Sequence, residues 1–172
     1  MSDSTVHNLM PGTEGIKFSA TLPEGTIPYA SVDVTSKRAL RVTRAKGDSF
    51  TLSFEVRRST AGKVAAYLYN SSGNAKKDSY VDGSLNSHGT PDGYVQYDAG
   101  PEWRYVAITW EYLEDPKQPM DYVIPARLLR ADAAAGTTVE VRNLMMVRGT
   151  TPAAWAPADG ENIAGGGCSH ER

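Results

Sequence analysis

The chain has 172 residues, 40% of them hydrophobic, and its 18 Lys and Arg against 20 Asp and Glu give a formal charge of -2. One globular domain of this length buries roughly 70% of the surface of its unfolded chain. No clustered positive charge favours nucleic-acid binding, and no apolar run approaches the roughly 18 residues of a membrane span. The single cysteine, Cys168, excludes an intrachain disulfide and a four-cysteine zinc site.

The chain begins with MSDSTVHNLMPG, which has neither the charged region nor the apolar region of a signal peptide. We therefore expect synthesis and assembly in a cytoplasm. Three units are expected along the chain: a leader over residues 1–15, one folded domain over 16–160, and a flexible Gly-rich tail over 161–172.

Apolar and polar residues alternate over the first part of the predicted domain. The pattern is clearest over 49–57, where four large apolar residues share one parity, so we expect a strand with one buried face. The same alternation over 40–43, with a turn signal over 45–48, predicts an antiparallel partner. A third strand is predicted over 64–69, before a cluster of turn-forming residues.

The middle of the chain is harder to assign. Residues 73–100 are polar and Gly-rich, which predicts one or two short strands within long loops. The next strong strand is predicted over 103–112, with Val106, Ile108 and Trp110 facing the core. In 121–129, Pro125 predicts an edge strand or a loop, because proline donates no ladder hydrogen bond.

A short turn over 130–135 and a final strand over 137–147 follow, because six residues are too few for an unaided helix. Apolar alternation in this strand gives way at Leu144 to four consecutive apolar residues, which indicates a β-bulge or burial on both faces. Six or more short strands separated by turns predict an all-β sandwich of two antiparallel sheets.

Three segments, in order, resemble the jelly-roll domains of carbohydrate-binding-module type found in bacteriophage tail and other virion structural proteins. They are RALRVTRAKGDSFTLSFEVRRS, EWRYVAITW and AGTTVEVRNLMMVRGTTPAAWAPADGE. The likeness spans 38–161, although 76–101 matches only in its loop-like character. The last segment is the most specific, and its matching residues are Asn143, Leu144, Met146, Gly149, Thr151, Pro152, Trp155 and Pro157. The resemblance implies a jelly-roll sandwich on a phage particle, but it names no ligand.

The tryptophans are assigned structural roles. Pro152 and Pro157 prevent the chain beyond the final strand from continuing in a central strand position, so it leaves the sheet. We expect Trp155, between them, to fold back as an apolar plug rather than to stack on a ligand. Trp103 and Trp110 are expected to pack as well.

Tyrosines are the candidate glycan contacts, because exposed rings stack on the apolar faces of sugars. We expect one sheet surface to carry Tyr67, Tyr69 and Tyr105, and the neighbouring loops to carry Tyr94 and Tyr97. The alternative is that the pair Tyr67 and Tyr69 packs against a neighbouring strand or subunit.

No reactive centre or cofactor is predicted. The three histidines lie in the leader, a polar loop and the tail, and no Gly-x-Ser-x-Gly elbow is present. Acidic loop residues are dispersed, so no metal is expected, with Ca²⁺ as the lesser alternative; these residues are Asp82, Asp92, Asp98 and Glu161. The expectation is a protein that is not an enzyme.

The functional expectation is a virion structural protein, either a minor tail protein or a capsid decoration component. Its partners would be other virion proteins and copies of itself, with Leu9, Met10 and Pro11 of the leader as candidate docking residues. The alternative is an adhesin, a glycan-binding module for host attachment that contacts host or mucosal polysaccharide. Neither expectation involves nucleic acid or membrane insertion.

Overall fold

The computed structural model describes residues 18–32, 45–68, 75–89, 94–115 and 123–152, and these residues form strands and turns with no helix. No segment of this described part is therefore a helix able to cross a bilayer. The strands are β1 (Phe18–Thr21), β2 (Tyr29–Val32), β3 (Ser49–Arg58), β4 (Gly62–Leu68), β5 (Ala75–Val81), β6 (Ser84–Gly89), β7 (Val95–Ala99), β8 (Arg104–Tyr112), β9 (Val123–Leu129) and β10 (Thr138–Arg148).

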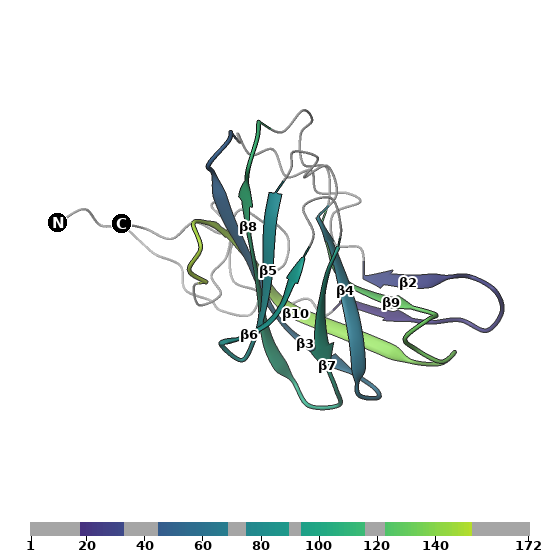
Figure 1. Ribbon diagram of the computed structural model, residues 1–172. Coiled ribbons are helices and arrows are strands. Elements are labelled where there is room, and N and C mark those ends of the chain that lie inside the picture. The colour runs from purple at the N-terminus through teal and green to yellow at the C-terminus, as the bar shows by residue number, and fades with distance from the viewer. Residues whose placement is uncertain (1–17, 33–44, 69–74, 90–93, 116–122, 153–172) are drawn as a thin grey trace, which may run out of the picture.

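The described residues form two antiparallel sheets (Figure 1). The larger sheet has the order β1-β10-β3-β8-β5-β6, and the smaller has the order β2-β9-β4-β7. Successive strands pass from one sheet to the other at every step except β5 to β6, which is the alternation of a jelly-roll sandwich. The predicted all-β sandwich of two antiparallel sheets is confirmed.

A single core fills the space between the sheets. Phe54 of β3 meets Tyr97 of β7 edge to face, with ring centroids 5.7 Å apart, so this contact joins the two sheets. Phe50 stacks on Trp110 at 5.6 Å. The Tyr97 hydroxyl donates to the Pro125 carbonyl at 2.9 Å, which satisfies its polar atom inside the core.

The strands with strong alternation are confirmed. β3 buries Phe50, Leu52, Phe54 and Val56, while β8 buries Val106, Ile108 and Trp110, as the apolar parity predicts. In β10 the register against β3 shifts between Arg142 and Met145, and residues 144–147 are all buried. This segment therefore has both a β-bulge and burial on both faces.

The prediction of one or two short strands over 73–100 is wrong, because this region contains β5, β6 and β7. The inward positions of β5 include Lys77 and Ser79. Because these two residues are polar, the sequence of β5 does not show the alternation of apolar and polar residues that identifies a strand. Asp82 and Gly83 both have positive φ and connect β5 to β6 as a two-residue hairpin turn. This Asp-Gly pair is the sequence signal that indicates the hairpin.

The prediction that Pro125 marks an edge strand or a loop is also wrong. β9, which contains this proline, lies between β2 and β4 in the smaller sheet. The register of β4 against β9 shifts between Ala65 and Tyr67, opposite the proline. A bulge interrupts the ladder there, so the missing N–H removes no regular hydrogen bond.

Several sequence-based predictions concern residues outside the described parts of the chain. They are the leader with Leu9, Met10 and Pro11, the strand over 40–43, Tyr69, the plug Trp155, and the tail with Cys168. These remain predictions.

Candidate functional site

Three tyrosines and one arginine form a row across the outer face of the smaller sheet, which we call the tyrosine row. The guanidinium carbon of Arg127, on β9, lies 4.1 Å from the ring centroid of Tyr29, on β2, and 4.2 Å from that of Tyr67, on β4. Tyr94, directly before β7, places its ring centroid 5.0 Å from that of Tyr67. The row therefore follows the strand order β2-β9-β4-β7 and spans about 14 Å at the usual strand spacing.

The ring faces within the row are not equivalent. Arg127 and Tyr94 lie on opposite sides of Tyr67, because their strands flank β4, so both faces of this ring are covered. Tyr29 and Tyr94 are the ends of the row and keep 45% and 40% of their surface exposed. A ligand ring can therefore stack at the two ends, while Tyr67 holds the row together.

Arg127 makes the row rigid. It is only 8% exposed, and its Nε donates a 2.6 Å hydrogen bond to Ser31 Oγ on β2. A guanidinium held between two aromatic faces gains cation–π attraction on both sides. Tyr29 and Tyr67 are thus fixed before any ligand arrives, which lowers the entropy cost of binding.

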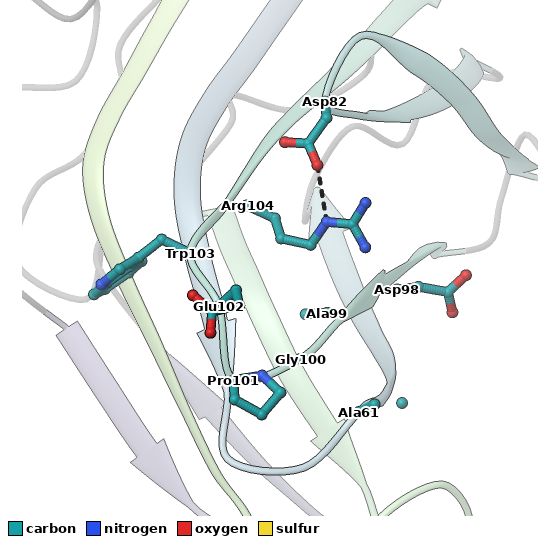
Figure 2. Close-up of a pocket in the computed structure, with 10 residues that line it drawn as sticks. Ala61, Asp82, Asp98, Ala99, Gly100, Pro101, Glu102, Trp103 and Arg104 are labelled. Atoms are coloured by element: carbon teal, nitrogen blue, oxygen red, sulfur yellow. Dashed lines mark hydrogen bonds and ion pairs between the residues drawn. The ribbon is translucent and has the colours of Figure 1, made fainter.

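The second feature is a hollow of about 710 Å³ at one end of the sandwich, which we call the end pocket (Figure 2). This volume falls within the usual range of small-molecule sites. Small residues at the β3–β4 turn and after β7 form much of its wall, and charged side chains surround them. The lining residues are Ala61, Gly62, Asp82, Asp98, Ala99, Gly100, Pro101, Glu102, Trp103 and Arg104.

Asp82 is held as an ionised carboxylate. It accepts hydrogen bonds from the backbone N–H of Tyr105 at 3.0 Å and from Arg104 Nε at 2.9 Å. These two bonds, the backbone one first, lower the pKa of Asp82. A carboxylate with a lowered pKa is ionised at neutral pH, so Asp82 presents hydrogen-bond acceptors to a ligand in the end pocket.

Arg104 uses only Nε in its bond to Asp82, and within the described residues its two terminal nitrogens have no hydrogen-bond partner. Figure 2 shows the guanidinium lying between Asp82 and Asp98. Asp98 in turn lies 3.8 Å from Nζ of Lys63, on β4. The end pocket therefore offers both hydrogen-bond donors and carboxylate acceptors to a ligand.

The structure brings together some of the tyrosines predicted as glycan contacts and separates others. Tyr67 and Tyr94 meet in the tyrosine row, whereas Tyr105 lies on β8 of the other sheet, so the expectation of one shared surface is wrong for it. Tyr97 is fully buried, and this burial raises its pKa well above the usual value. Its ring faces inward because it shares the parity of Val95 on β7, so it cannot contact a glycan.

Tyr29 and Arg127 were not identified from the sequence. Tyr29 lies in a four-residue strand with no visible alternation of apolar and polar residues. Arg127 comes two residues after Pro125, which led us to expect an edge strand or a loop there. Strand pairing is what brings them together: Ser31, two residues after Tyr29 on β2, is opposite Arg127, and Arg127 is opposite Ala65, two residues before Tyr67 on β4. Such cross-strand pairing depends on a sheet order that one sequence does not reveal.

The two described tryptophans occupy different environments. Trp110 is buried in the core, as its structural assignment requires. Trp103 is half-buried on the outer face of the larger sheet, with Arg57 and Arg142 over its ring at 4.7 and 3.9 Å. Both guanidiniums also pair with a glutamate, Arg57 with Glu140 at 2.9 Å and Arg142 with Glu55 at 2.5 Å. This cluster ties β3, β10 and the start of β8 together.

No group of three or more histidine, cysteine, aspartate or glutamate side chains among the described residues is arranged to hold a metal ion. His88, on β6, pairs through Nδ1 with Asp78 of β5 on an exposed face, 2.5 Å away. These two side chains lie on adjacent strands of the larger sheet, away from the smaller sheet that carries the tyrosine row.

No protein-family model and no curated protein sequence matches this chain. Among solved structures, a candidate sugar-binding protein from Bacteroides thetaiotaomicron matches with a TM-score of 0.37 and 13% identity, over 85% of this chain and 96% of that one. The tripod from the baseplate of bacteriophage Tuc2009 matches with a TM-score of 0.39 and 13% identity, over 90% of this chain and 59% of that one. At these scores we transfer neither ligand nor partner to this chain.

Proposed function

We propose that this protein is a non-enzymatic glycan-binding module whose binding surface is the tyrosine row. The observation that carries the proposal is the pair of exposed rings, Tyr29 and Tyr94, fixed at the two ends of a rigid row on one sheet face. Sugars present apolar C–H faces to such rings and hydroxyls to the polar groups beside them.

We further propose that the module is carried on a bacteriophage particle, as a structural component of the tail or capsid that contacts host polysaccharide. This part rests on the resemblance of residues 38–161 to the jelly-roll domains of virion structural proteins. Detection of the chain by mass spectrometry in particles purified from a producing host tests this placement. Recovery of the chain only from the particle-free lysate argues against it.

Alanine substitution of the row ends tests the binding surface. A glycan array probed with the full chain should show binding to oligosaccharides, and titration calorimetry with the best binder should give its Kd. Tyr94→Ala and Tyr29→Ala are each expected to weaken that Kd by about tenfold, because each removes one stacking face.

Tyr105→Ala is the matched control, because this exposed tyrosine lies on the other sheet. It should leave the Kd unchanged. An array without any bound glycan would falsify the proposed function. Equal losses for Tyr105→Ala and Tyr94→Ala would show that glycan binding does not depend on the tyrosine row.

A further inference from the structure

We propose that the tyrosine row and the end pocket are two parts of one site, which binds an extended, uncharged oligosaccharide along β4 and β7. This inference rests on the proposed glycan-binding function and adds the ligand's charge, its minimum length and its direction on the sheet.

The pairing of β4 with β7 places the two features on one track. Ala66 is opposite Val95, so Tyr67 and Tyr94 follow as the next pair at the row, whereas Lys63 is opposite Asp98 at the far end. Asp98 also lines the end pocket. The four residue-to-residue steps from Tyr94 to Asp98 span about 13 Å of extended strand, which exceeds the length of a single sugar ring.

Polar side chains follow this track between Tyr94 and the end pocket, and at the pocket itself. Gln96 shares the outward parity of Tyr94 and Asp98, because Val95 and Tyr97 face the core. Lys63, on the neighbouring strand, is also exposed and lies beside Asp98. A chain of sugars that stacks on Tyr94 therefore passes hydrogen-bonding groups before it reaches the end pocket.

The charges of the end pocket favour an uncharged ligand. Three carboxylates, from Asp82, Asp98 and Glu102, line the end pocket together with the guanidinium of Arg104. With Lys63 beside Asp98 included, three carboxylates stand against two cationic groups, so a uronic or sialic acid would still meet more negative than positive charge here, which is repulsive. A neutral sugar hydroxyl can accept a hydrogen bond from Arg104 and donate one to a carboxylate at the same time.

The test compares chain lengths and charges on one array. The probes are neutral hexose and N-acetylhexosamine oligosaccharides as mono- to hexasaccharide series, with sialylated and uronic-acid-containing glycans beside them. The full chain should prefer a neutral series, and binding should strengthen with each added residue until both ends of the track are occupied. Asp98→Ala and Arg104→Ala should each weaken the long members by about tenfold and leave the shortest binder unchanged.

Glu111→Ala is the matched control, since it removes an exposed carboxylate of β8 outside the end pocket. If both pocket variants bind long oligosaccharides as tightly as the parent protein, while Tyr94→Ala still weakens binding, the extended site is overturned and the proposed function stands. A preference for acidic glycans would overturn the charge argument. If the unmodified protein binds no glycan on the array, the result counts against the proposed function itself.

Discussion

At the scale of single residues, Arg58 and Gly62 form an unusual buried contact. Arg58 is almost fully buried, and its terminal nitrogens donate to the carbonyls of Thr60, at 2.5 Å, and Asp132, at 2.7 Å. Burial lowers the pKa of this guanidinium, which stays charged nonetheless. A Cβ on Gly62 would lie 2.5 Å from Arg58 Nη1. The glycine is required because the arginine lies directly against its backbone.

Gly62→Ala is therefore expected to lower the free energy of unfolding by about 2 kcal/mol, since the buried arginine must give up its hydrogen bonds to make room. Urea denaturation followed by circular dichroism measures this change. Gly100→Ala is the control, because its new Cβ would meet Ala61 at an ordinary 3.7 Å. Equal free energies of unfolding for the two variants would show that the Arg58 side chain can move away from the new Cβ without destabilising the protein.

At the scale of elements, the bulge in β10 explains why the alternation in this strand stops. Asn143 has a φ of 54° at the register shift, a left-handed conformation that asparagine and glycine tolerate best. Its Nδ2 also donates to Glu55 Oε2 at 3.1 Å. Before the bulge the odd-numbered residues Val139 and Val141 face the core. After the extra residue the even-numbered residues Leu144 and Met146 face it instead.

Asn143→Ala should destabilise the protein by about 1 kcal/mol, because alanine in the left-handed region carries a steric cost. Asn143→Gly should cost less, since glycine accepts this backbone conformation and only the exposed hydrogen bond is lost. Thermal unfolding monitored by circular dichroism distinguishes the two variants. If alanine and glycine prove equally destabilising, the Glu55 contact rather than the backbone conformation selects asparagine.

Polar side chains of β5 and β6 join the larger sheet to β7, an edge strand of the smaller sheet. The backbone carbonyl of Gln96, on the edge strand β7, accepts hydrogen bonds from Ser79 Oγ at 2.7 Å, Ser87 Oγ at 2.5 Å and Asn86 Nδ2 at 3.0 Å. These donors come from β5 and β6 of the other sheet. The contacts occupy an edge carbonyl that could otherwise pair with another chain.

At the scale of the whole molecule, the two sheets share one core and neither is expected to persist alone. The contact of Phe54 with Tyr97, and that of Tyr97 with the Pro125 carbonyl, link strands of both sheets. Each sheet would expose its apolar face if the other unfolded, which is unfavourable at about 25 cal/mol per Å².

We therefore expect one cooperative unfolding transition in urea, with coincident midpoints by far-ultraviolet circular dichroism and by tryptophan fluorescence. Phe54→Ala should shift both midpoints together and lower the free energy of unfolding by about 3 to 5 kcal/mol. Two separated transitions would mean that one sheet survives the loss of the other, contrary to a shared core.

The sequence by itself determined the fold class, because alternation with a period of two is a local property of strands such as β3, β8 and β10. It also identified Tyr67 and Tyr94 as candidate contacts. Only the tertiary structure decided that Tyr105 lies on the other sheet from Tyr67 and that Arg127 joins Tyr29 to Tyr67. These outcomes depend on strand order and register, which arise from pairing between distant segments, and local residue patterns do not encode that pairing.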